Sequence, residues 1–133
     1  MNINSLLKKI SNQYITHVKV DDWGYSILIM EIQGKSFGRV YWYNDDPDAI
    51  YLDWLSVDES CRKDGLGTRM QEIRERIGRS IGAKWAILMV LDKNSWLYAW
   101  YLKRGYQDYS THEQEENVIW MRKLLDSVPI SSY

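Results

Sequence analysis

The residues best suited to chemistry in this sequence lie in a short glycine-bearing loop that opens a helix. The loop and first helical turn comprise Arg62, Lys63, Asp64, Gly65, Leu66, Gly67 and Thr68. The glycines leave backbone N–H groups open to close approach by an anion. The start of the helix adds unpaired N–H groups and the positive end of its dipole. Because arginine, lysine and threonine side chains supply further donors, the loop predicts a phosphate-binding site.

A plain strand-to-helix turn also fits these two glycines, so the loop alone leaves both interpretations open. It lacks the Gly-x-x-x-x-Gly-Lys of a Walker A loop and the Gly-x-Gly-x-x-Gly of a dinucleotide-binding fold. A nucleoside triphosphate or NAD is therefore not favoured as the ligand.

The elements before the loop are predicted from their side-chain pattern. Helical spacing of apolar residues predicts one short helix over residues 4–12. Alternating and β-branched segments then predict four strands, with turns at residues 22–24 and at Gly34. These strands span residues 14–20, 25–33, 35–43 and 49–57, the last preceded by a polar turn over 44–48.

After the loop, the apolar period changes to three or four residues, which predicts a helix over 65–81 that ends at Gly82. The continuous apolar run 85–91 is typical of a buried parallel strand. Strand 49–57, this helix and strand 85–91 thus form a right-handed βαβ unit. A helix over about 95–103, capped by Asn94 or Ser95, and two strands around an acidic turn at 113–117 complete the chain.

Two motifs in this order resemble those of the general N-acetyltransferase (GNAT) superfamily. The first is Leu-x-Val-x-x-x-x-Arg-x-x-Gly-x-Gly-Thr over residues 55–68. The second is Ala-Trp-Tyr-Leu-Lys-Arg-Gly-Tyr over residues 99–106, preceded by Asn94. The resemblance covers about residues 35–125 and implies an α/β (α+β) fold. Its central sheet would be mixed and mostly antiparallel, with the βαβ unit at its centre and a shortened N-terminal helical region.

The resemblance also implies a ligand and roles for particular residues. Acetyl-CoA would be the co-substrate, with no metal. Its pantetheine arm would pair with the backbone of Leu55, Ser56 and Val57, and its pyrophosphate with the backbone of residues 62–68. Asn94 would contact the coenzyme arm, and Tyr101 would protonate the departing thiolate. From the residues alone, Asn94 fits equally well as a helix cap. Tyr101 also fits as a core aromatic residue.

Transfer of an acetyl group to an amine requires few catalytic parts. The amine must lose a proton, the carbonyl oxygen needs a hydrogen bond, and the thiolate needs an acid. No covalent intermediate is required, so Cys61 is expected to be incidental. We interpret Asp53 as the base, with Tyr51, Glu31 or a water chain as alternatives. A solvated or turn-bonded carboxylate is the simpler interpretation of Asp53.

Length and composition favour a single domain over residues 1–133, with 126–133 as a loose tail. The net charge of −1 argues against nucleic acid as a partner. A single cysteine fits a reducing compartment, and neither a signal peptide nor a membrane span is predicted. We therefore expect a cytoplasmic protein. The expected partner is the amine of a small molecule or peptide, and both a monomer and a homodimer remain open.

Two features depart from the family pattern. Asp64 places a negative charge in the loop, and the N-terminal half lacks the two helices that the family usually has between its first strands. The acceptor site would then be open or completed by a partner subunit, with aromatic residues available to line it: Trp23, Trp42, Tyr43, Trp54 and Trp96. These departures keep an alternative open, in which a non-catalytic domain of this fold binds an acyl-CoA or a protein partner.

Overall fold

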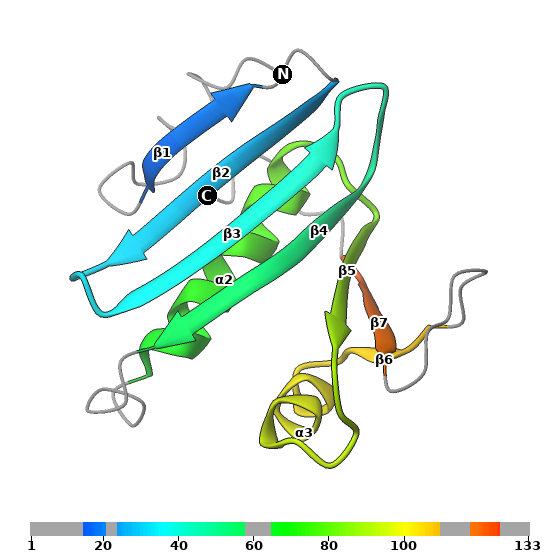
Figure 1. Cartoon of the computed structure of the whole chain (residues 1–133). Coiled ribbons are helices and arrows are strands. Elements are labelled where there is room, and N and C mark those ends of the chain that lie inside the picture. Colours follow the sequence, from blue (N-terminus) through cyan, green and yellow to red (C-terminus); the bar gives the residue numbers. More distant parts are fainter. Residues whose placement is uncertain (1–14, 21–23, 58–64, 110–117, 126–133) are drawn as a thin grey trace.

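The computed structural model describes residues 15–20, 24–57, 65–109 and 118–125 (Figure 1). Its strands before the crossover are β1 (Ile15–Val20), β2 (Tyr25–Ile32), β3 (Ser36–Tyr43) and β4 (Asp46–Val57). The elements that follow are α2 (Leu66–Ser80), β5 (Trp85–Val90), α3 (Trp96–Lys103), β6 (Gln107–Asp108) and β7 (Ile119–Leu124).

Across the described residues, seven strands form one sheet in the order β1-β2-β3-β4-β5-β7-β6. β4 and β5 pair in parallel, whereas the other neighbouring strands pair antiparallel. α2 makes the crossover between the two parallel strands, as a parallel pair requires. This confirms the predicted mixed, mostly antiparallel sheet with a central βαβ unit.

α2 covers one face of the sheet, lying across β2, β3 and β4 (Figure 1). The strands alternate accordingly, with every second side chain of β2 and β3 buried. Gly38 lets the helix approach closely, because a Cβ there would lie 2.8 Å from Met70 Cγ. The most deeply buried apolar residues of this layer include Leu28, Met30, Val40, Ile50, Met70 and Ile77. The opposite face of these strands is left half-exposed.

β4 and β5 pair over a short distance only. The last pair is Leu52 with Leu88, and beyond it the described strands separate. β4 continues beside β3, where Leu52 pairs with Val40 and Trp54 with Arg39. Asp53 therefore has no partner on β3 and forms a β-bulge at the point where β5 leaves.

Several boundaries differ from those predicted. β4 begins at Asp46 rather than at residue 49, because residues 44 and 45 alone make the turn and Tyr43 pairs with Asp46. Pro47 misled the prediction, although its fixed φ is compatible with an extended strand. Four residues separate β1 from β2, too few for the family's two helices. The predicted helix 4–12, turn 113–117 and tail 126–133 lie outside the described residues.

Candidate active site

Within the described residues, the N-terminus of α2 has no side-chain cap. Gly65, the N-cap, adopts the left-handed conformation (φ +76°), and the first turn holds no acidic residue. The first N–H groups of a helix have no partner within it. An anion in front of Gly65 would therefore meet these donors and the positive helix end. Of the predicted loop, Leu66 is buried, Gly67 and Thr68 are half-buried, and Arg62, Lys63 and Asp64 lie outside the described residues.

Arg104 reaches this helix start from the end of α3, a contact that sequence reasoning missed. Its Nη2 donates to Thr68 Oγ1 at 2.7 Å, and its guanidinium stacks on the Trp100 ring at 3.5 Å. Burial lowers the pKa of Arg104 from its usual value, although this group stays charged. A positive charge is thus held beside the first turn of α2.

The end of β4 has one backbone edge that β5 does not pair. Leu55, Ser56 and Val57 pair with Gly38, Phe37 and Ser36 of β3. On the side of β5, pairing stops at Leu52. Backbone donors and acceptors on that side can accept an extended ligand as an added strand. This unpaired edge leads directly to the loop before α2.

Ser95, and not Asn94, is the N-cap of α3. Its Oγ accepts from Tyr98 N at 3.3 Å and donates to the Asp92 carbonyl at 2.7 Å. The backbone N–H of Asn94 donates to Asp92 Oδ1, and its exposed amide makes no hydrogen bond within the described part of the chain. The capping alternative for Asn94 is therefore wrong, and its amide is available to a ligand.

Tyr101 is almost fully buried, at 4% exposure, with its hydroxyl turned toward α2. Arg74 Nη2 donates to this hydroxyl at 3.2 Å. The ring packs edge-on against Trp100 and Tyr106, with centroids 5.0 and 5.3 Å away. Tyr101 is therefore a core aromatic residue, and its hydroxyl oxygen also has a polar neighbour. Its packing in the core is compatible with the predicted role as an acid.

Asp53 lies on the opposite face of the sheet and is held by Arg39. Arg39 Nε and Nη2 donate to the two carboxylate oxygens at 2.8 and 2.6 Å. Asp53 is thus an exposed carboxylate held in a fork-to-fork ion pair with an arginine and not bonded to a turn. Asp53 and Tyr101 are not in contact. Arg39 nevertheless connects the two residues. Its side chain binds Asp53, and its backbone carbonyl accepts from Nη1 of Arg74, the residue that bonds to Tyr101, at 3.3 Å.

A hollow of about 330 Å³ surrounds this ion pair on the half-exposed face. Its lining comprises Tyr25, Ile27, Arg39, Tyr41, Tyr43 and Asp53. Tyr41 stacks on Tyr51 with centroids 5.1 Å apart, and Tyr43 meets both rings edge-on. Burial, reinforced by Tyr43, raises the pKa of Tyr41 to about 12, so this phenol is neutral at physiological pH.

The comparison with known families decides the identity. The sequence profile of the acetyltransferase (GNAT) family matches residues 7–106, most of the chain. The chain belongs to this family. No curated protein matches it by sequence.

Solved structures of acetyltransferases share the GNAT fold of the chain. Aminoglycoside 6'-acetyltransferase type Ii is 23% identical (81% of this chain and 74% of that one covered, TM-score 0.61). Nourseothricin acetyltransferase is 16% identical (83% and 71%, TM-score 0.62). The PaiA N-acetyltransferase from Thermoplasma acidophilum, in complex with coenzyme A, is 18% identical (92% and 68%, TM-score 0.61).

The described residues fit the coenzyme that this GNAT family uses. An uncapped helix start suits a pyrophosphate, and the unpaired edge of β4 suits an extended amide-bearing arm. The part of the GNAT chain that is described contains no cluster of three or more His, Cys, Asp or Glu placed to hold a metal. Within the same residues, no helix is long and apolar enough to span a membrane.

Of the aromatic residues predicted to line the acceptor site, Tyr43 lines the hollow beside Asp53. Trp42 was wrong, because its side chain points to the α2 side of the GNAT sheet and is 5% exposed. Trp96 is exposed on α3, while Trp23 and the side chain of Trp54 lie outside what is described. Tyrosines of β2 and β3 line the hollow instead, and their alternation with buried residues was the signal that could have found them.

Proposed function

We propose that this protein transfers the acetyl group of acetyl-CoA to a primary amine of a small molecule or a protein, without a covalent enzyme intermediate. The observation that carries this proposal is the separation of β4 from β5 after Leu52, on the strand that leads through residues 58–64 to the uncapped N-terminus of α2. An unpaired strand edge and an anion-binding helix start then lie in succession along the chain. A coenzyme with an amide-bearing arm and a pyrophosphate needs both features.

The coenzyme would be held chiefly by backbone groups. Leu55, Ser56 and Val57 would pair with its arm, and Asn94 would donate its available amide to that arm. The pyrophosphate would lie against Arg62, Lys63, Asp64, Gly65, Leu66, Gly67 and Thr68. Bound there, the coenzyme supplies an activated thioester carbonyl. The groups that accept and donate protons come from the chain.

Two side chains would move the protons. Asp53 accepts a proton from the amine, directly or through water, and Arg39 keeps the carboxylate oriented. The nitrogen forms a bond to the carbonyl carbon as the carbon–sulfur bond breaks. Tyr101 gives its hydroxyl proton to the sulfur. Water then carries the proton from Asp53 away and returns one to Tyr101, so that the reaction yields an amide and a free thiol.

The hollow beside Asp53 would receive the acceptor. The phenol of Tyr41 remains neutral, and aromatic ring faces together with a carboxylate suit an amine that carries further cationic groups. Arg39 does not oppose this, because Asp53 neutralises its charge through both oxygens. The name of one structural relative, an aminoglycoside acetyltransferase, supports testing polycationic amines first.

The proposal is tested by measuring the release of free thiol from acetyl-CoA with a panel of possible acceptors. The panel comprises polyamines, aminoglycosides, amino acids and peptides. Asp53→Asn and Tyr101→Phe should each lower turnover on the order of 100-fold, the contribution of a general acid or base. Coenzyme binding, measured by calorimetry, should persist in both. Asp45→Asn, in the exposed β3–β4 turn, is the matched control and should leave turnover unchanged.

Three results would count against the proposal. Absence of heat with either acetyl-CoA or CoA would remove coenzyme binding altogether. Binding without thiol release for any amine would favour the non-catalytic alternative. Full turnover in Tyr101→Phe would remove Tyr101 as the acid.

A further inference from the structure

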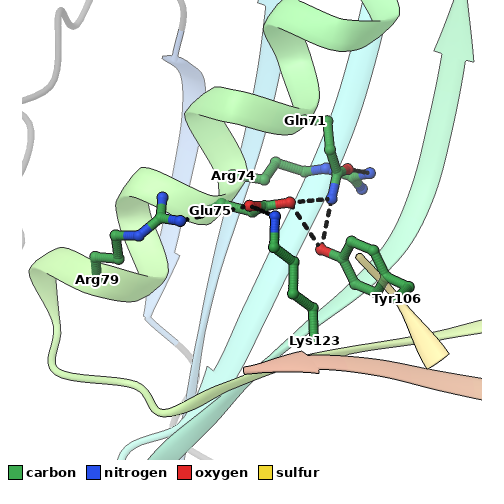
Figure 2. A network of polar contacts seen from close by, with 6 residues as sticks. All are labelled: Gln71, Arg74, Glu75, Arg79, Tyr106 and Lys123. Atoms are coloured by element: carbon green, nitrogen blue, oxygen red, sulfur yellow. Dashed lines mark hydrogen bonds and ion pairs between the residues drawn. The ribbon is translucent and has the colours of Figure 1, made fainter. Parts of the chain in front are cut away.

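A buried polar network lies between α2 and the sheet, where an amphipathic helix normally presents apolar residues (Figure 2). Gln71, Arg74 and Glu75 of α2 are buried, Arg74 completely. Glu75 accepts from Gln71, Tyr106 and Lys123, and Arg79 pairs with it at 3.7 Å. Buried charged groups of this kind are expensive unless well bonded, and removing one partner from such a network is strongly destabilising.

Arg74 stands at the end of this network that faces Tyr101. Its Nη2 donates to Gln71 Oε1 at 2.6 Å and to the Tyr101 hydroxyl at 3.2 Å. Its Nη1 donates to the Arg39 carbonyl at 3.3 Å. The amide of Gln71 is in turn oriented by bonds to Glu75 and Tyr106. The guanidinium is therefore fixed from two sides before it meets the phenol.

The two buried tyrosines in contact with each other have opposite hydrogen-bond roles. Tyr106 donates its hydroxyl proton to Glu75 Oε2 at 3.1 Å. An arginine has donors and no acceptor, so the Tyr101 oxygen can only accept from Arg74. No group in the described residues takes the proton of Tyr101. Arg74 thus occupies a lone pair of this oxygen and leaves its proton available for donation.

We propose that Arg74 is a positioning residue for Tyr101 in the acetyl transfer, an inference that rests on the proposed function. The guanidinium fixes the phenol so that its O–H points away from the network. When the proton passes to the sulfur, the pair of electrons left on the Tyr101 oxygen is stabilised by the adjacent positive charge. The role of Arg74 ends when water returns a proton to Tyr101.

The first test detects the contact between Arg74 and Tyr101 without measuring enzymatic activity. In protein labelled with ¹³C at the tyrosine Cζ, the Tyr101 resonance is assigned by its absence from Tyr101→Phe. Arg74→Lys and Arg74→Gln should each shift this resonance. Arg79→Gln is the matched control, because Arg79 pairs with Glu75 on the same helix without a bond to Tyr101. A Tyr101 resonance that moves as much in Arg79→Gln as in the Arg74 variants would overturn the proposal.

The second test is a double-mutant cycle on turnover, with the amine that gives most thiol release. Arg74→Gln should lower kcat roughly 10- to 100-fold, the worth of a hydrogen bond to a charged group. In Tyr101→Phe the same change should lower kcat about twofold or less, because the two residues act as a unit. Arg74→Lys, which keeps the charge, should recover part of the loss. The KM for acetyl-CoA and CoA binding should change little.

The outcomes separate this inference from the proposed function. Equal losses from Arg74→Gln in both backgrounds would overturn the inference and leave the acetyltransferase activity standing. Absence of thiol release by the unmodified protein with every amine would remove the proposed function and this role of Arg74 with it. If Arg74→Gln does not fold, the cycle is run with Arg74→Lys, and equal losses in the two backgrounds again overturn the inference.

Discussion

Arg104 Nη2 donates a hydrogen bond to Thr68 Oγ1 over 2.7 Å and so joins the end of α3 to the first turn of α2. The same guanidinium stacks on Trp100 and donates through Nη1 to the carbonyl of that residue. A cation near the positive end of a helix is unfavourable by itself and becomes favourable when an anion binds there. The pyrophosphate of the proposed coenzyme, bound at the same place, would make this contact favourable.

Arg104→Leu should weaken CoA binding about fivefold, since one charge at a helix end contributes about 1 kcal/mol. The loss should shrink as salt is raised, because an exposed phosphate is screened. Arg104→Lys keeps the charge and should retain most of the affinity. Calorimetric titration of CoA at two ionic strengths measures both effects. Equal affinity in Arg104→Leu and the unmodified protein would contradict this role.

Gly65→Ala should weaken both stability and CoA binding, whereas Gly82→Ala should weaken stability alone. Both glycines have positive φ, +76° and +82°, and at neither would a Cβ meet an atom within 4 Å. Each alanine should therefore destabilise the protein by roughly 1–2 kcal/mol of backbone strain. Only Gly65 lies at the N-terminus of α2, where a methyl group would stand in front of the N–H donors. Urea unfolding and CoA titration of both variants check the prediction. Equal CoA affinities of Gly65→Ala and Gly82→Ala would contradict it.

Ser95→Ala and Asn94→Ala should separate stability from binding at neighbouring positions. Ser95→Ala removes the cap of α3 and should lower the free energy of unfolding by about 1 kcal/mol. Asn94→Ala removes an exposed amide and should leave the unfolding midpoint unchanged while weakening CoA binding. Thermal unfolding and calorimetry on both variants make the comparison. A stability loss in Asn94→Ala as large as that in Ser95→Ala would show that the assignment of the cap is incomplete.

The sequence was informative about the fold because several of its elements carried a clear hydrophobic period. The alternation in β2 and β3 and the three-to-four spacing in α2 arise from burial on one face, which a single sequence records directly. The ends of the helices and strands were harder to predict from the sequence. Pro47 looked like part of a turn, although pairing between Tyr43 and Asp46 draws it into β4.

Contacts between elements could not be predicted in the same way. The ion pair of Arg39 with Asp53 depends on the register of β3 and β4 and on the bulge at Asp53, which leave no trace in either segment alone. The network around Arg74 was missed for a different reason. Its residues are polar, and a polar residue on a helix is ordinarily assigned to the solvent side.

The last prediction concerns the pH dependence of stability through Tyr106. Burial, reinforced by the nearby Glu75 carboxylate, raises the pKa of Tyr106 well above its usual value of about 10. The folded protein thus binds this proton more tightly than the unfolded chain does. The stabilisation is fully present below pH 10 and is lost progressively as the pH rises above it, by at most about 1.4 kcal/mol per pH unit.

Tyr106→Phe should therefore be most destabilising near pH 8, where Glu75 and Gln71 each lose a hydrogen-bond partner at a loss of roughly 1–3 kcal/mol. Above pH 10 the unmodified protein loses stability through Tyr106, and the phenylalanine variant does not. The difference in unfolding free energy between the two should then shrink. Urea unfolding of both proteins from pH 8 to pH 11 measures it. A difference that stays constant over this range would mean that Tyr106 does not hold its proton through the buried contact with Glu75.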